Sequence, residues 1–200
     1  MDHEVVILDD MSRGAMENIH TQAEFILGST LDENILKEVL SGGVEAVIHL
    51  AAFKAAGESM VDPEKYSTNN ISGTLCLLNA MAATEVKTIV FSSTASVYGY
   101  PVYLPMDEDH PTKPINFYGY TKMAIEQHLK WYGQLKGIKF AALRYFNAAG
   151  YDGGSRVLGR SLRMCRPAGP SLCCHTRESR CRRTRERLGR PEQPRNFPHT

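Results

Sequence analysis

Short apolar segments alternate with helical segments over the first three quarters of the chain, and this alternation restricts the possible folds more than any other feature. The strand-like segments are 4–10, 44–50, 88–92 and 138–144, and the helical segments between them are 31–41, 63–83 and 118–135. Strands that are apolar on both faces and separated by helices are typical of a parallel sheet with helices on both faces. We therefore predict a doubly wound α/β domain.

Charge divides the 200-residue chain into two parts. Residues 1–152 carry 11 basic and 19 acidic side chains, a net charge of −8. Residues 153–200 carry 12 Arg, no Lys and 3 Glu, a net charge of +9, together with four of the five cysteines. We predict a partial dinucleotide-binding domain over 1–152 and an Arg-rich tail over 153–200.

The tail admits three interpretations. Its arginines could neutralise nucleic-acid phosphates. Its cysteines could bind zinc, although they form no CxxC pair and His175 lacks a ligand-like spacing. We favour the third interpretation, a disordered or out-of-frame segment, because no hydrophobic period of 2 or 3.6 residues is present. No metal site is expected, and nucleic acid is not the expected partner.

The rest of the composition is ordinary for a soluble globular chain. Hydrophobic residues make up 42% of the chain, and no apolar run approaches the length of a membrane span. The N-terminus lacks the basic flank of a signal peptide. We expect a cytoplasmic protein without a membrane anchor.

A hydroxyl-rich segment, Ser92-Ser93-Thr94, leaves a predicted strand, and Tyr118 and Lys122 follow on a predicted helix. Residues four apart share one helix face, so the phenol and the amine can meet. An ammonium beside a phenol favours the phenolate and lowers the pKa of the tyrosine. The pattern predicts proton transfer to and from an alcohol, with a nicotinamide as hydride carrier.

Other polar residues follow the predicted strands. Asp9 and Asp10 end the first strand, where an acid can bind the adenosine ribose and favour NAD over NADP. Lys54 follows the second strand and could reach ribose or phosphate. His49 is interpreted as a structural histidine. Asn70, in the helical segment 63–83, could serve the site or a structural hydrogen bond equally well.

The order of these blocks resembles the extended short-chain dehydrogenase/reductase superfamily. Three blocks, 53–59, 69–75 and 143–150, resemble the UDP-glucose 4-epimerases in particular. The resemblance covers residues 1–152. It implies bound NAD, a UDP-glucose or UDP-galactose substrate, and a homodimer formed through the helices around 65–83 and 118–135.

The resemblance also implies roles for individual residues. Tyr118, Lys122 and Thr94 would be catalytic, and Thr94, Tyr118 and Asn147 would contact the substrate. The cofactor would be bound by Asp9, Lys54, Asn70, Ser92, Ser93, Tyr118, Lys122 and Phe146.

Two departures from the family concern activity. No glycine-rich phosphate turn precedes Val5, and a C-terminal substrate domain is missing. We therefore expect a truncated chain that is inactive or unstable. Two alternatives are a nucleotide-sugar 4,6-dehydratase or decarboxylase and a non-enzymatic gene remnant or Arg-tail binder. Ala95 and Ser96 stand where a dehydratase needs an acid pair, which argues against dehydration.

Overall fold

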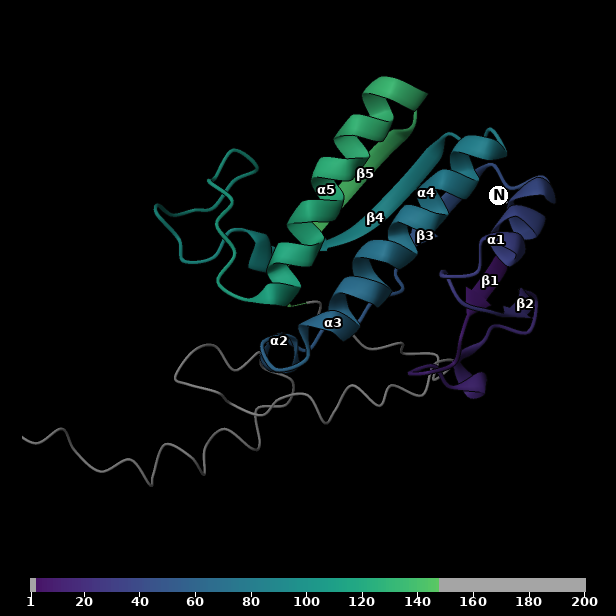
Figure 1. Cartoon of the computed structure of the whole chain (residues 1–200), viewed down its shortest axis with the longest axis horizontal. Coiled ribbons are helices and arrows are strands. Elements are labelled where there is room, and N and C mark those ends of the chain that lie inside the picture. Colours follow the sequence, from purple (N-terminus) through teal and green to yellow (C-terminus); the bar gives the residue numbers. More distant parts are fainter. Residues whose placement is uncertain (1–2, 148–200) are drawn as a thin grey trace, which may run out of the picture. The chain divides into compact units, whose positions relative to one another are not determined.

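The computed structural model describes residues 3–147. The predicted boundary at 152 and the tail 153–200 lie outside the described residues. The strands form two parallel sheets (Figure 1). In one, β1 (Val6–Asp9) pairs with β2 (Glu24–Leu27). In the other, β4 (Thr88–Thr94) lies between β3 (Ala46–His49) and β5 (Lys139–Tyr145).

Helices connect the strands, as parallel pairing requires. They are α1 (Glu33–Ser41), α2 (Ala56–Ser59), α3 (Pro63–Tyr66), α4 (Gly73–Ala83) and α5 (Phe117–Lys136). A π-helical segment, Ser67–Ser72, joins α3 to α4, and short 3₁₀ turns occupy Met16–Asn18 and Ala95–Val97. Polar caps begin α1 and α5: the Asp32 side chain accepts from two backbone N–H groups of α1, and the Asn116 side chain accepts from the Gly119 N–H of α5.

The core lies between the three-stranded sheet and the helices α4 and α5, which run alongside it in Figure 1. Ile89 and Phe91 of β4 point into this core and are at most 1% exposed. On the opposite face of the sheet, Ile48, Leu143 and Tyr145 are 70%, 41% and 45% exposed. Within the described residues, the helices therefore cover one face of this sheet.

The structure confirms the predicted alternation of parallel strands and helices, but within the described residues helices cover one face of the three-stranded sheet and not both. The strands also differ from the prediction in two places. The sequence reasoning assigned no strand to Glu24–Leu27, which forms β2. Ser93 and Thr94, predicted in a loop, belong to β4 because their backbones pair with Arg144 and Tyr145 of β5. Among the described residues, no helix combines the length and the hydropathy needed to span a bilayer.

Candidate active site

The candidate site lies where the carboxyl end of β4 meets the first turns of α5. β4 ends at Thr94, and α5 begins at Phe117. The backbone N–H of Tyr118 donates to Ser59 Oγ at 3.0 Å, and this bond ties the first turn of α5 to α2. Tyr118 and Lys122 are one turn apart, as predicted, so both face the end of the strand.

Thr94 acts on the pKa of Tyr118, so the two side chains lie near each other. The Ser96 N–H donates to Thr94 Oγ1 at 3.2 Å. Burial raises the pKa of Tyr118, and Thr94 opposes that rise because it stabilises the phenolate. Thr94 therefore favours the deprotonated form of Tyr118.

Lys122 is almost completely buried, at 2% exposed. Its Nζ donates to the Ser92 carbonyl oxygen at 2.9 Å and lies 4.7 Å from the centroid of the Phe91 ring. Burial lowers the pKa of Lys122 to about 8. The prediction that Lys122 lowers the pKa of Tyr118 is wrong for this structure. The amine is turned to the strand carbonyl, and burial of the phenol raises its pKa instead.

A buried ion pair beside Lys122 was not found by the sequence reasoning. Arg144 of β5 donates from Nε and Nη2 to the two carboxylate oxygens of Glu126, at 3.1 and 2.7 Å. The Ser93 hydroxyl donates to the same carboxylate. Ser93, predicted to line the cofactor, is thus 2% exposed, and its hydroxyl is used by Glu126. Ser92 takes part in the site through its carbonyl.

The predicted cofactor residues occupy the carboxyl ends of several strands. Asp9 ends β1, and its Oδ1 accepts from the Met11 N–H at 2.7 Å. Lys54 follows β3 and is exposed. Phe146 follows β5 and is 62% exposed, and the predicted substrate residue Asn147 beside it is exposed as well. Ligands of open α/β sheets bind at this edge.

The Asn70 side chain is buried, with 1% of its surface exposed, and it hydrogen-bonds to the backbone of Phe53. Its side-chain Oδ1 accepts from the Phe53 N–H at 2.9 Å, and its Nδ2 donates to the Phe53 carbonyl at 3.0 Å. The two bonds fix the segment that leads into Lys54. Of the two interpretations of Asn70, the structural one is the one with contacts in the structure.

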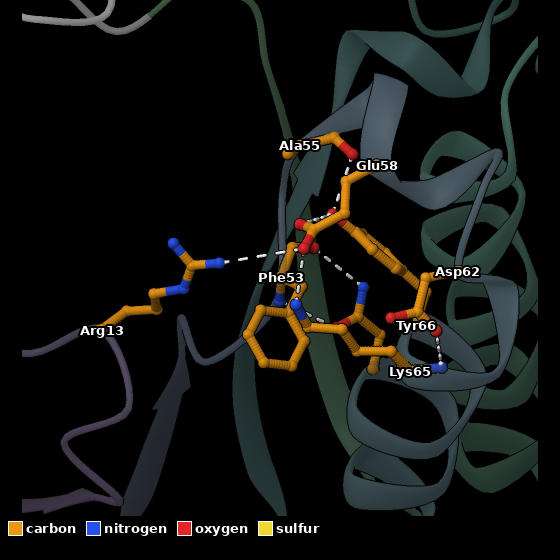
Figure 2. A network of polar contacts seen from close by, with 8 residues as sticks. Arg13, Phe53, Ala55, Glu58, Asp62, Lys65 and Tyr66 are labelled. Atoms are coloured by element: carbon orange, nitrogen blue, oxygen red, sulfur yellow. Dashed lines mark hydrogen bonds and ion pairs between the residues drawn. The ribbon is translucent and has the colours of Figure 1, made fainter.

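A polar cluster around Glu58 supports the same segment (Figure 2). The Glu58 carboxylate accepts from Lys65 Nζ at 2.6 Å and from the Tyr66 hydroxyl at 2.9 Å. Arg13, from the loop after β1, lies 4.0 Å from the carboxylate, and the Lys65 amine lies 4.4 Å from the Phe53 ring centroid. The hydrogen bond from Lys65 lowers the pKa of Glu58, so this cluster stays ionised at neutral pH.

His49 is a structural histidine, as predicted. The Thr74 hydroxyl donates to the Asn70 carbonyl at 2.6 Å, so the His49 Nε2–H donates to Thr74 Oγ1 at 2.8 Å. Burial lowers the pKa of His49 to about 3, and the ring therefore stays neutral. Within residues 3–147, no cluster of three or more His, Cys, Asp or Glu side chains is arranged to hold a metal ion.

Comparison with known proteins assigns the chain to a family. The model of the NAD dependent epimerase/dehydratase family matches residues 1–180. The chain belongs to this family. As an epimerase/dehydratase, it is 43% identical over 151 residues to a UDP-glucose 4-epimerase of Streptococcus mutans, a match that covers 74% of this chain and 45% of that protein. A UDP-glucose 4-epimerase of Streptomyces lividans is 39% identical over 158 residues, covering 78% of this chain and 48% of that protein.

Solved structures of epimerases share the fold of this family member. The UDP-glucose 4-epimerase of Brucella ovis, crystallised in complex with NAD, superposes with a TM-score of 0.73 at 40% identity, covering 75% of this chain and 46% of that one. The enzyme of Thermotoga maritima, crystallised with UDP-glucose, gives a TM-score of 0.69 at 34% identity, covering 72% and 47%. The chain spans about half the length of the curated relatives it matches.

Proposed function

We propose that this chain carries the catalytic centre of a UDP-glucose 4-epimerase, which interconverts UDP-glucose and UDP-galactose through NAD-dependent oxidation at the sugar C4. The observation that carries the proposal is the grouping of Thr94, Tyr118 and the buried Lys122 where the end of β4 meets α5. This arrangement moves a proton to and from an alcohol. The curated relatives with this activity support the choice of substrate.

The residues after Thr94 favour epimerisation over dehydration. A dehydratase needs a carboxylic acid there to protonate the leaving hydroxyl, and Ala95 and Ser96 occupy these positions. The carboxylate of Glu126, nearby on α5, already accepts from Arg144 and Ser93. The site therefore offers a proton acceptor for an alcohol but no acid for elimination.

The residues at the carboxyl ends of the strands fit NAD. Asp9 offers a carboxylate for ribose hydroxyls, the exposed Lys54 offers a cation, and the exposed Phe146 ring offers a flat apolar surface. Lys122 and Tyr118 would hold the nicotinamide end. When bound, NAD would take hydride from the sugar C4 and return it.

The chain's own groups handle the proton. Tyr118, as the phenolate that the Thr94 hydroxyl favours, would accept the proton of the sugar 4-hydroxyl and become a neutral phenol. When the 4-keto sugar has turned its other face, Tyr118 returns the proton and the opposite configuration at C4 results. Asn147, exposed after β5, would contact the substrate diphosphate.

The test uses the purified full chain with NAD and UDP-galactose, followed by NMR of the sugar anomeric protons. Against the expectation from the sequence that the chain is inactive, the grouping of Thr94, Tyr118 and Lys122 leads us to expect that UDP-glucose forms, and that Tyr118→Phe lowers the rate at least about 100-fold because the proton acceptor is lost. Thr84→Ser, a conservative change at the end of α4, is the matched control. A 4-keto-6-deoxy product, or equal rates for the wild-type chain and Tyr118→Phe, would refute the proposal.

We also propose a homodimer formed through α5. Trp131 and Leu135 on this helix are 60% and 72% exposed, and large apolar side chains of this kind often mark an interface. Sedimentation equilibrium of the wild-type chain and of Trp131→Glu tests this. A monomeric wild-type chain, or a dimer that Trp131→Glu leaves intact, would contradict it.

A further inference from the structure

The only buried carboxylate on the strand-facing side of α5 has no part in the proton transfer described above. Glu126 is 5% exposed and lies one turn after Lys122 on α5. Both of its oxygens accept from the Arg144 guanidinium, which reaches it from β5. A two-pronged contact of this kind fixes direction as well as distance, because the guanidinium and the carboxylate are both planar.

Glu126 and Lys122 together hold the end of β4. Lys122 Nζ donates to the carbonyl of Ser92, and the hydroxyl of the next residue, Ser93, donates to Glu126. Thr94, which acts on the pKa of Tyr118, is the residue after that. Two successive turns of α5 are therefore hydrogen-bonded to two successive residues of β4, Ser92 and Ser93, immediately before Thr94.

Arg144 extends the same connection to the segment that follows Thr94. Its guanidinium carbon lies 4.9 Å from the centroid of the Tyr98 ring, and its Nη1 donates to the Glu108 carbonyl at 3.3 Å. One arginine thus contacts α5 and two parts of the connection between β4 and α5. These contacts bring together the elements that carry Thr94, Tyr118 and Lys122.

We propose that Glu126, oriented by Arg144, is a positioning residue that holds Ser93 against α5 and so sets Thr94 and Lys122 at their places around Tyr118. A role of Glu126 in catalysis rests on the proposed function, but the test of its positioning role needs neither NAD nor a sugar. The readout is the titration midpoint of the Lys122 amine, which is measured by NMR on protein with 13C at Cε of its lysines. The Lys122 signal is assigned as the one that Lys122→Met removes.

The predicted direction separates positioning from simple charge removal. If Glu126 acts only through its charge, Glu126→Ala removes an anion and lowers the pKa of Lys122 further. If Glu126 positions the strand, Glu126→Ala lets the end of β4 move away from α5 and water reach the amine. The pKa then rises from about 8 toward its ordinary value, and we expect a shift of about one unit or more.

Two variants complete the test. Glu126→Gln keeps an acceptor for Ser93, and we expect it to stay within about half a unit of the wild-type midpoint. Leu129→Ala, at a fully buried position further along α5, is the matched control for lost stability and should leave the midpoint unchanged. If Glu126→Ala does not fold, Ser93→Ala removes the same hydroxyl–carboxylate bond and should raise the midpoint in its place.

The inference is overturned if Glu126→Ala, or Ser93→Ala in its place, leaves the midpoint where it was or lowers it in a folded chain. It is also overturned if Leu129→Ala raises the midpoint equally. A chain that fails the epimerase assay but shows the expected titrations would refute the proposed function and retain the positioning role. A chain that is active as an epimerase but whose variants leave the Lys122 midpoint unchanged would refute the positioning role and retain the proposed function.

Discussion

Acid should destabilise this chain through one buried residue, His49. Its ring is 5% exposed, stacks on Phe91 and donates to Thr74. The folded chain keeps the ring neutral down to a pKa of about 3, whereas the unfolded chain takes up a proton below about 6.5. The stability that His49 contributes is therefore fully present above pH 6.5 and is lost as the pH falls toward 3. Linkage between these two pKa values gives a loss of about 2 kcal/mol between pH 7 and pH 5.

The assay is urea unfolding followed by circular dichroism at pH 7 and pH 5, on the wild-type chain and on His49→Gln. Glutamine keeps an N–H donor for Thr74 but does not titrate. The variant should lose about 2 kcal/mol less than the wild-type chain over this pH interval, whatever its stability at pH 7. His3→Gln, at an exposed position, is the matched control and should behave as the wild-type chain does. Equal pH-dependent losses in the wild-type chain and His49→Gln would refute the reasoning.

Three further predictions follow from single contacts. Because burial lowers the pKa of Lys122 to about 8, unfolding free energy should rise by about 2.5 kcal/mol between pH 7 and pH 10, an increase that Lys122→Met should abolish in urea titrations. Gly99→Ala should lower the unfolding free energy by more than about 2 kcal/mol, because φ at Gly99 is +71° and a Cβ there would lie 2.0 Å from the Lys113 carbonyl oxygen. Gly137→Ala is the control: its φ is +70° but the space around it is open, so the loss should be about 1 kcal/mol. Equal losses of melting temperature in the two variants would contradict this. Asn70→Ala should cost about 2–4 kcal/mol in chemical unfolding, since two backbone groups lose their partners, and a loss below about 1 kcal/mol would show that they find others.

The sequence predicted features that repeat along the chain or lie within one helix. Apolar strands alternating with helices predicted the parallel α/β architecture, and a spacing of four residues predicted that Tyr118 and Lys122 share a face. β2 escaped prediction because Glu24–Leu27 offers only three apolar residues in a row, too few to distinguish a strand from a loop. Its strand conformation comes from pairing with β1.

The other features of the site depend on contacts between residues far apart in the sequence, and they could not be predicted from local patterns. Lys122 was expected to act on Tyr118, but its amine reaches a carbonyl 30 residues away in the sequence. The Glu126–Arg144 pair joins a helix to a strand 18 residues away; Glu126 belongs to no motif found in the sequence, and Arg144, within the block 143–150, was given no role. Only the pairing of β4 with β5 brings these groups to one place.

The π-helical segment Ser67–Ser72 has a consequence for changes in chain length. Each residue of an α-helix turns the chain by about 100°, so the number of residues in this segment sets the angle between the faces of α3 and α4. Substitution of the exposed Thr68 leaves that angle unchanged. Deletion of the same residue with the winding unchanged would rotate α3 relative to α4 by about a quarter turn, and only a change from π-helical to α-helical winding would keep the two faces aligned. Sequence variation in this part of the chain is therefore restricted in length more strictly than in residue type.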